Sequence, residues 1–166
     1  MISIIAAIGK NRELGKDNKL LWHIKEDMKR FKKLTQNQIV IMGRKTYESL
    51  PKKFRPLPHR INIVITSNPK NLAFNNHPSL IIVGSIDEAL KKAKTFNKEI
   101  FIAGGASIYK QTLEIADKLY LTIVEKNYPD ADAFFPPYET HFPKIISQLK
   151  REENGLIYWF LELIKI

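Results

Sequence analysis

Hydrophobic residues come in short runs along the chain, separated by polar stretches rich in glycine, proline and asparagine. Apolar runs of about four to eight residues are typical of buried strands, and apolar residues three or four positions apart are typical of helices that cover a sheet. The pattern predicts strands over residues 2–8, 39–42, 61–65, 80–83, 99–103, 119–124, 145–149 and 156–164. It predicts helices over residues 24–34, from 44 to the vicinity of Pro51, from 86 onward and from 106 onward.

The order of these elements indicates the fold class. Strands that alternate with helices predict an α/β domain whose central sheet is mostly parallel and flanked by helices. The dipeptide Asn154-Gly155 between the last two apolar runs predicts an antiparallel hairpin at the C-terminal end. The sequence has no internal repeat, so we expect one domain over residues 1–166. Residues 9–21 are polar and predict a long loop, a kind of segment that is often functional.

The charge balance narrows the choice of partners. The chain carries 27 Lys and Arg against 17 Asp and Glu, a formal net charge of +10. Such a charge suits nucleic acid, acidic lipid and phosphorylated small molecules. The basic residues are scattered, however, and this favours a solvated, lysine-rich surface over a nucleic-acid interface.

The sequence contains no cysteine, which excludes disulfides, thiol catalysis and cysteine metal sites. A cysteine-free chain fits a reducing compartment, and we expect a cytoplasmic location. The apolar start of the chain lacks a basic flank and a cleavage site, so it predicts a strand and not a signal peptide. No apolar stretch is long enough to predict a membrane span.

Two junctions, over residues 39–50 and 100–109, each combine a buried strand, a glycine and a helix start. Arg44, Lys45 and Thr46 follow the first glycine, and the second junction holds the pair Gly104-Gly105. A helix start offers free N–H groups and a positive dipole end, so added cations favour a negative ligand there. Because ligands of open α/β sheets bind outside the carboxyl ends of the strands, both junctions could line one crevice for a dinucleotide. At the first junction an ordinary strand–turn–helix with two solvated basic side chains remains the alternative, and the second junction is weak evidence when taken alone.

Asp27 stands out in the helix predicted over residues 24–34. It falls at helical spacing with Ile24, Met28 and Phe31, so a carboxylate lies on or beside the apolar stripe. One interpretation is an acid stabilised by the helix dipole. The other is a carboxylate in a half-closed pocket, where its raised pKa would suit proton transfer or binding of a cationic ligand.

Other candidates are weaker when taken singly. Trp22 has core packing as its default role, and Arg60 is either a surface residue or a bidentate clamp for a carboxylate. The four histidines lack metal-ligand spacing, so we expect no metal site. The chain also lacks the GxSxG motif of covalent hydrolases.

Several short motifs share their order and spacing with one known family. They are Ile2 to Ala7; Leu14-Gly15 with Asn18, Leu20 and Trp22; Asp27 with Phe31; Val40 to Ser49; Arg55 to Asn62; Gly104-Gly105 with Tyr109; Leu119 to Thr122; and Asp132 with Phe135-Pro136. Together they resemble dihydrofolate reductase of the bacterial type over nearly the whole chain.

The resemblance implies hydride transfer from NADPH to 7,8-dihydrofolate, which yields tetrahydrofolate. It implies that Asp27 binds the pterin amino and ring nitrogens and favours protonation of the ring nitrogen beside the hydride acceptor. It implies that Arg60 clamps the α-carboxylate of the substrate's glutamate. The implied substrate site comprises Ile5, Asp27, Met28, Phe31, Leu50, Leu57, Arg60, Ala103 and Thr122. The implied catalytic set is Asp27 with Leu20, Trp22, Thr122 and Tyr109.

The resemblance also implies a site for NADPH. Arg44 and Ser67 are expected at its 2′-phosphate, which favours NADPH over NADH, and the 9–21 loop is expected to close over the nicotinamide. The Gly104–Gly105 peptide is expected to be cis. The implied cofactor contacts are Ala6, Ala7, Leu14, Gly15, Asn18, Gly43, Arg44, Lys45, Thr46, Thr66, Ser67, Gly84, Gly104, Gly105, Ala106, Ser107, Ile108 and Tyr109. We expect a monomer that binds dihydrofolate and antifolate inhibitors, without nucleic acid, membrane or metal.

The sequence departs from the family pattern in places. Leu21 replaces the proline that usually precedes the tryptophan, and Ala103 replaces a larger aliphatic residue. Two alternatives stay open: a reductase of related fold that acts on another heterocycle, such as a riboflavin-pathway pyrimidine, and a basic nucleic-acid-binding module. The first should lack the combination of Asp27, Phe31 and Arg60. The second should interleave aromatic and basic residues on one surface.

Overall fold

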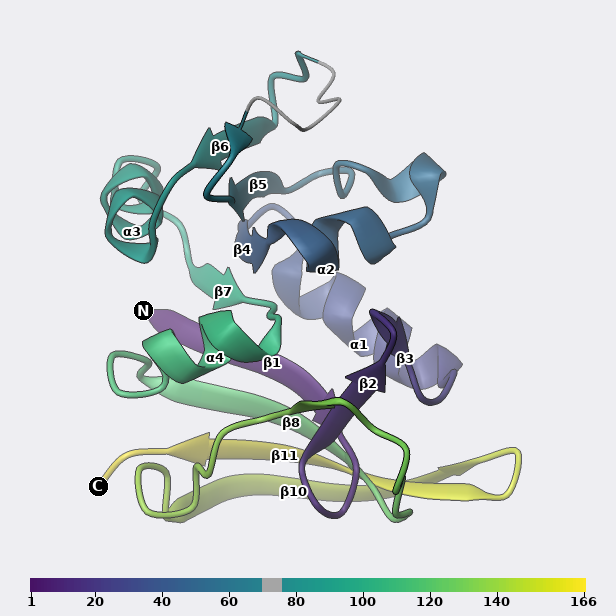
Figure 1. The fold of residues 1–166 in the computed structure, drawn as a ribbon. Coiled ribbons are helices and arrows are strands. Elements are labelled where there is room, and N and C mark those ends of the chain that lie inside the picture. The colour runs from purple at the N-terminus through teal and green to yellow at the C-terminus, as the bar shows by residue number, and fades with distance from the viewer. Residues whose placement is uncertain (70–75) are drawn as a thin grey trace.

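An eight-stranded sheet runs through the molecule in the order β10-β11-β8-β1-β7-β4-β5-β6 (Figure 1). The structure is a computed structural model and describes residues 1–69 and 76–166. The strands are β1 (Ile2–Ile8), β4 (Ile39–Gly43), β5 (Ile61–Ile65), β6 (Leu80–Val83), β7 (Ile100–Ile102), β8 (Lys118–Val124), β10 (Lys144–Glu153) and β11 (Leu156–Ile164). The strands from β8 to β6 pair in parallel, whereas β11 pairs antiparallel with β8 and β10. The mostly parallel sheet with a C-terminal hairpin is confirmed.

The inner parallel strands of the sheet are largely buried on both faces, which explains their continuous apolar runs. Along β4, Ile39 and Ile41 belong to one hydrophobic cluster, and Val40 and Met42 belong to another. The helices are α1 (Lys25–Thr35), α2 (Arg44–Ser49), α3 (Ile86–Lys94) and α4 (Ala106–Thr112), with a 3-10 turn at Lys52–Phe54. In the described part of the chain, each helix is too short or too polar to cross a membrane.

The predictions for α3 and the hairpin turn are confirmed in detail. The Ser85 side chain caps α3 by accepting a hydrogen bond from the Glu88 N–H at 3.2 Å. Asn154 and Gly155 have φ values of 52° and 77°, and positive φ at both central residues is the conformation that a two-residue hairpin turn requires. β10 extends to Glu153, beyond the predicted end at residue 149. Its last residues are charged and exposed at the sheet edge, so they carry no apolar signal.

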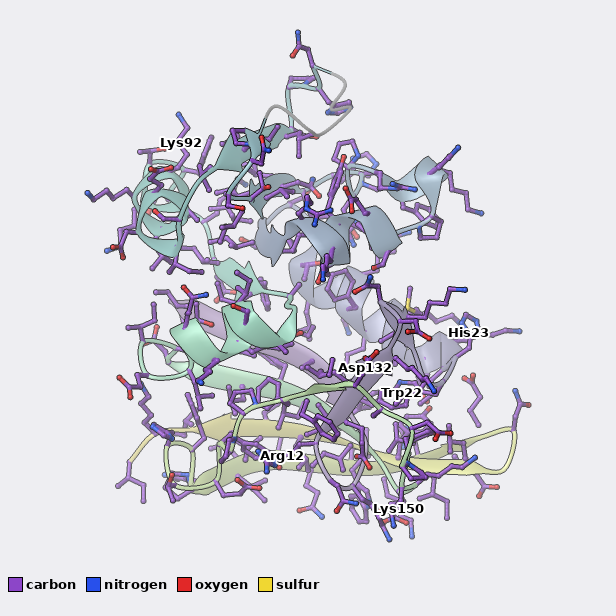
Figure 2. All side chains as sticks on the ribbon, in the orientation of Figure 1. Arg12, Trp22, His23, Lys92, Asp132 and Lys150 are labelled. Atoms are coloured by element: carbon purple, nitrogen blue, oxygen red, sulfur yellow. The ribbon has the colours of Figure 1, made fainter. Side chains whose placement is uncertain are left out.

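The prediction of a long loop over residues 9–21 is wrong where this segment forms strands. This segment contains β2 (Glu13–Lys16) and β3 (Lys19–Leu20), which form a three-stranded sheet with β9 (Ala133–Phe134). Asp17 and Asn18 turn the hairpin with φ values of 49° and 60°. Figure 2 shows Asp132 beside this hairpin, and its Oδ2 accepts a hydrogen bond from the Asp17 N–H at 3.0 Å. Strands of two to four residues are too short to show an alternating pattern.

The predicted apolar stripe of α1 is only partly buried. The Met28 side chain is 48% exposed, and Thr35 is the buried residue of this helix. The placement of Met28 on a packed face is therefore wrong. Phe31 does pack, because it lies against the cluster that contains Leu57 and Tyr47. Lys92 and Lys150 project from opposite ends of the molecule (Figure 2), so the positive charge is widely spread.

Candidate active site

The two glycine junctions lie side by side at the carboxyl ends of β4 and β7. The Gly43 N–H donates to the Gly104 carbonyl at 2.8 Å, and the Ala103 N–H donates to the Ile41 carbonyl at 2.9 Å. The Gly104–Gly105 peptide is cis, as expected. Gly104 has a φ of 103°, and a Cβ there would lie 3.1 Å from the Tyr109 ring. Glycine is required because this conformation and this close approach exclude a side chain.

Tyr109 connects α4 to β1. Its hydroxyl donates to the Ile5 carbonyl at 2.8 Å, and its ring centroid lies 4.9 Å from that of Phe135. Burial raises the pKa of Tyr109, so the hydroxyl remains a neutral donor at physiological pH. This bond fixes the middle of β1 against the glycine pair.

Asp27 turns toward the sheet. Its Oδ1 accepts a hydrogen bond from the Thr122 hydroxyl of β8 at 2.5 Å. Thr122 pairs with Ala7 of β1, so the carboxylate contacts β8 beside β1. Burial raises the pKa of Asp27 above its ordinary value, while the Thr122 hydrogen bond and the charge of Arg30 oppose that rise. Asp27 also lies in the first turn of α1, where the helix dipole favours an acid, so the two interpretations of this residue are compatible.

Apolar residues from distant parts of the chain surround the same region. Val40, Met42, Tyr47, Leu57 and Val64 form a buried cluster, against which Phe31, Leu50 and Ala103 pack. Four expected apolar contacts of the substrate, Phe31, Leu50, Leu57 and Ala103, are therefore together in space, whereas Ile5 and Met28 lie outside this cluster. Trp22 belongs to another buried cluster, and its ring centroid lies 5.2 Å from that of Tyr128. The Trp22 Nε1 is buried with no hydrogen-bond partner among the described residues. Leu20 is 60% exposed on β3 and lies outside these clusters.

Arg60 is held in a fixed position and is not a surface residue. The residue is 6% exposed; its Nε donates to Thr35 Oγ1 at 3.1 Å, and its Nη1 donates to the Pro58 carbonyl at 2.6 Å. Its Nη2 lies 3.4 Å from the Lys32 carbonyl. All three acceptors are uncharged, so the guanidinium keeps its full positive charge. Burial lowers the pKa of Arg60, but arginine stays protonated in proteins.

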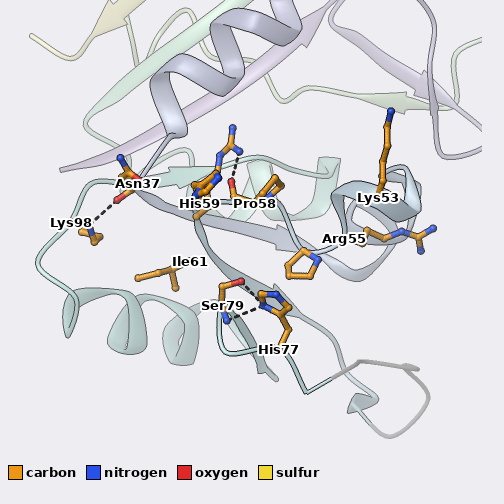
Figure 3. A pocket seen from close by; sticks show the side chains of 11 residues that line it. Asn37, Lys53, Arg55, Pro58, His59, Ile61, His77, Ser79 and Lys98 are labelled. Atoms are coloured by element: carbon orange, nitrogen blue, oxygen red, sulfur yellow. Dashed lines mark hydrogen bonds between the residues drawn. The ribbon is translucent and has the colours of Figure 1, made fainter.

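A basic cavity of about 660 Å³ adjoins Arg60. It lies at the start of β5, beside Ile61, and does not include Asp27 or the glycine pair. Figure 3 shows Lys53 and Arg55 at one end of the cavity and Asn37 and Lys98 at the other. No acidic side chain is among the described residues that line it.

The expected contacts for the 2′-phosphate lie after three adjacent strands. Arg44 follows β4 and Ser67 follows β5 by two residues, whereas Gly84, expected as a general cofactor contact, follows β6; the register aligns Gly43 with Ile65 and Ile65 with Val83. Arg44 Nη1 is paired with Glu48 at 2.8 Å on the surface of α2. Ser67 and Gly84 are exposed. Lys45, Thr46 and Thr66 lie beside them.

The remaining expected cofactor contacts fall into two groups. Ala106, Ser107 and Ile108 form the first turn of α4. Leu14, Gly15 and Asn18 lie on the β2–β3 hairpin, and Ala6 and Ala7 end β1 near it. In the described part of the chain, no group of three or more His, Cys, Asp and Glu residues could hold a metal ion.

Two charged residues with defined contacts were not predicted from the sequence. Glu13 is 2% exposed, and its carboxylate accepts backbone hydrogen bonds from Asn11 at 2.8 Å and Tyr128 at 3.0 Å. Arg30 follows Asp27 by one helical turn and reaches between β8 and β11. The spacing from Asp27 could have indicated Arg30. Nothing in the sequence distinguishes Glu13 from a solvated loop residue.

The chain is similar to known dihydrofolate reductases over almost its full length. The sequence profile of the dihydrofolate reductase family matches residues 1–165. The enzyme of Buchnera aphidicola from Acyrthosiphon pisum is 44% identical over 156 residues, which cover 93% of this chain and 91% of that one. The enzyme of Bacillus subtilis is 38% identical over 164 residues, which cover 97% and 92%.

A solved structure gives the same result. Dihydrofolate reductase from Enterococcus faecalis, complexed with NADP(H) and RAB-propyl, superposes with a TM-score of 0.87 at 27% identity and covers 99% of this chain and 96% of that one. The chain therefore belongs to the dihydrofolate reductase family, the NADPH-dependent oxidoreductases that reduce dihydrofolate to tetrahydrofolate.

Proposed function

We propose that Asp27 is the residue that holds the pterin ring of dihydrofolate and promotes its protonation. The observation that carries this role is the Thr122 hydrogen bond, which fixes one carboxylate oxygen and leaves the other for a ligand. An ionised carboxylate in a partly buried site stabilises a positive charge on a neighbouring ring more strongly than it would in water. The ring nitrogen beside the hydride acceptor is thereby favoured in its protonated form.

The apolar cluster and Arg60 supply the rest of the proposed substrate site. Phe31, Leu50 and Leu57 offer flat and aliphatic surfaces to the aromatic rings of the substrate. Arg60 offers a fixed guanidinium whose protein partners are all neutral, which suits bidentate binding of the terminal carboxylate. The basic cavity beside it adds positive potential at the same end (Figure 3).

The residues at the glycine junctions fit NADPH, which supplies the hydride when bound. Cβ atoms at Gly43 and Gly105 would lie 3.4 Å from Ile108 and 3.3 Å from Thr46, so their absence leaves the backbone accessible. We assign Arg44 and Ser67 to the 2′-phosphate because they follow neighbouring strands at one edge of the sheet. The β2–β3 hairpin is the segment proposed to cover the nicotinamide and exclude water. The monomeric state and the cytoplasmic location remain predictions from the sequence.

The decisive experiment follows NADPH consumption in a spectrophotometer. We expect NADPH absorbance to fall only after dihydrofolate is added, and methotrexate to stop the reaction. The Asp27→Asn variant should lose most of its turnover near neutral pH and recover part of it in acid, where the substrate arrives already protonated. Asp130→Asn is the matched control, because Asp130 is exposed and far along the chain. An Asp27→Asn variant with the normal rate at neutral pH would contradict the assignment.

A further inference from the structure

Arg30 is a basic residue with an unusual environment. Its Nη1 and Nη2 each donate to a strand carbonyl at 3.3 Å, that of Leu121 in β8 and that of Leu161 in β11. Its Cζ lies 4.6 Å from the centroid of the Phe160 ring and 5.7 Å from that of Tyr120. The guanidinium is thus fixed between two strands by neutral groups, which hold it in place without neutralising it.

One of these two strands, β8, also positions Asp27. Thr122, which donates to the Asp27 carboxylate, is the residue after Leu121, whose carbonyl accepts from Arg30. Asp27 and Arg30 are also three positions apart on α1, a spacing that places side chains on the same face of a helix. Arg30 and Asp27 are therefore linked in two ways: they share one face of α1, and they contact neighbouring residues of β8.

The other charged and titratable groups around this pair are already engaged or neutral. Glu162 of β11 is paired with Lys118 at 2.5 Å, and Glu26 of α1 accepts from Tyr158 at 2.6 Å and from Arg151 at 3.2 Å. Burial raises the pKa of both Tyr109 and Tyr158, so both stay protonated. The groups that face Asp27 or Arg30 are Glu162, Tyr120, Tyr109 and Tyr158. Among the described residues, Arg30 is the cation whose charge acts on Asp27.

We propose that Arg30 is a positioning residue for the reaction: its guanidinium supplies the counter-charge that keeps Asp27 ionised in a site partly closed to water. The inference rests on the proposed role of Asp27 at the pterin ring. Burial alone favours the neutral acid, which cannot stabilise a protonated ring. A fixed cation between β8 and β11 offsets part of that penalty and lets the site remain apolar enough for the substrate rings.

The test is a ¹³C NMR titration of the Asp27 side-chain carboxyl in the ligand-free protein, with the signal identified from its loss in Asp27→Asn. Arg30→Met keeps the apolar stem and removes the charge, and Arg30→Lys keeps the charge. Lys29→Gln is the matched control, since Lys29 is exposed on the same helix and carries the same charge. We expect the titration midpoint to rise by about one pH unit in Arg30→Met. It should stay near the unmodified value in Arg30→Lys and Lys29→Gln.

Two outcomes would overturn the inference: an unchanged midpoint in Arg30→Met, or an equal rise in Lys29→Gln. Near-UV circular dichroism verifies the fold of each variant, and Arg30→Gln replaces Arg30→Met if the latter does not fold. The titration needs no substrate, so its failure is separate from that of the proposed function. A shifted midpoint in a chain that does not reduce dihydrofolate would refute only the function, and an unshifted midpoint in an active chain would refute only the role of Arg30.

Discussion

The carboxylate of Glu13 connects the start of the 9–21 segment to the turn after β8, and Glu13→Gln tests that connection. The two carboxylate oxygens accept separate backbone N–H groups, from Asn11 and from Tyr128. A Cβ on Gly9 would meet the same carboxylate, so the chain is closely packed around it. Glutamine has a single acceptor oxygen, and its NH₂ group would face one of the two backbone donors.

The expected loss in the free energy of unfolding of Glu13→Gln follows from the number of hydrogen bonds that the substitution affects. A buried backbone N–H left without an acceptor costs about 1–3 kcal/mol, and a hydrogen bond to a charged group contributes about 1.5–3 kcal/mol. These two figures describe the same lost bond and are not added. We therefore expect the free energy of unfolding at pH 7 to fall by about 2–3 kcal/mol. For a chain of this length, the melting temperature should fall by about 5–10 °C.

Urea unfolding followed by tryptophan fluorescence provides the assay, because Trp22 packs against Tyr128, one of the two residues that Glu13 joins. Glu114→Gln removes the same charge from an exposed position and should change stability by less than about 0.5 kcal/mol. A loss in Glu13→Gln no larger than in Glu114→Gln would refute the proposed anchoring role.

The pH dependence of the free energy of unfolding supplies a second test of the anchoring role of Glu13. Burial acts to raise the pKa of Glu13, but the backbone hydrogen bonds together hold it below its ordinary value. A carboxyl whose folded-state pKa is lowered contributes stability above its unfolded value, about 4.3, and that contribution is lost as the pH falls through the folded value. The difference between Glu13→Gln and the unmodified chain should therefore shrink below pH 4.3 or so.

Three further predictions concern the proposed ligand site. Arg60→Ala should raise the KM for dihydrofolate by about 10–100-fold, since it removes a charged hydrogen-bonding partner, and equal changes in both KM values would argue against the clamp. Arg44→Ala should reduce the preference for NADPH over NADH in the ratio of kcat/KM, and a preserved preference would mean that another residue contacts the 2′-phosphate. Asp27→Asn should raise the melting temperature at pH 7, because the pKa of Asp27 is raised in the folded state. The stability that Asp27 contributes is therefore present below its unfolded-state pKa and is lost as the pH rises through its folded-state pKa. That gain should vanish in acid.

The inner strands of the sheet could be predicted because they are largely buried on both faces. A run such as residues 61–65 is apolar at nearly every position, and its predicted bounds match β5. The start of α3 was also predictable, because Ser85 and Glu88 form a local capping pair. Elements without a buried apolar run were missed, and β2, β3 and the charged half of β10 are the examples.

The site residues likewise divide into those that a local sequence pattern indicates and those that depend on contacts between distant parts of the chain. The glycine junctions and the placement of Asp27 follow from local patterns within one helix or one turn. The contact of Thr122 with Asp27 spans 95 positions of sequence, and that of Glu13 with Tyr128 spans 115. Neither contact leaves a local periodicity, so the sequence analysis obtained Thr122 only from the family resemblance and did not find Glu13. The exposure of Leu20 and Met28 likewise depends on tertiary packing that periodicity does not describe.

The C-terminal hairpin contributes to the electrostatics of the site although it lies at the sheet edge far from the glycine junctions (Figure 1). β8 is the strand where the parallel and antiparallel parts meet, since it pairs with β1 on one side and β11 on the other. From this position β8 supplies Thr122 to Asp27, while β11 supplies the Phe160 ring and the Leu161 carbonyl to Arg30. A shift of β11 by one residue would turn Phe160 to the opposite face and remove the support of the guanidinium. The hairpin register therefore affects the charge state of a carboxylate that the hairpin does not itself contact.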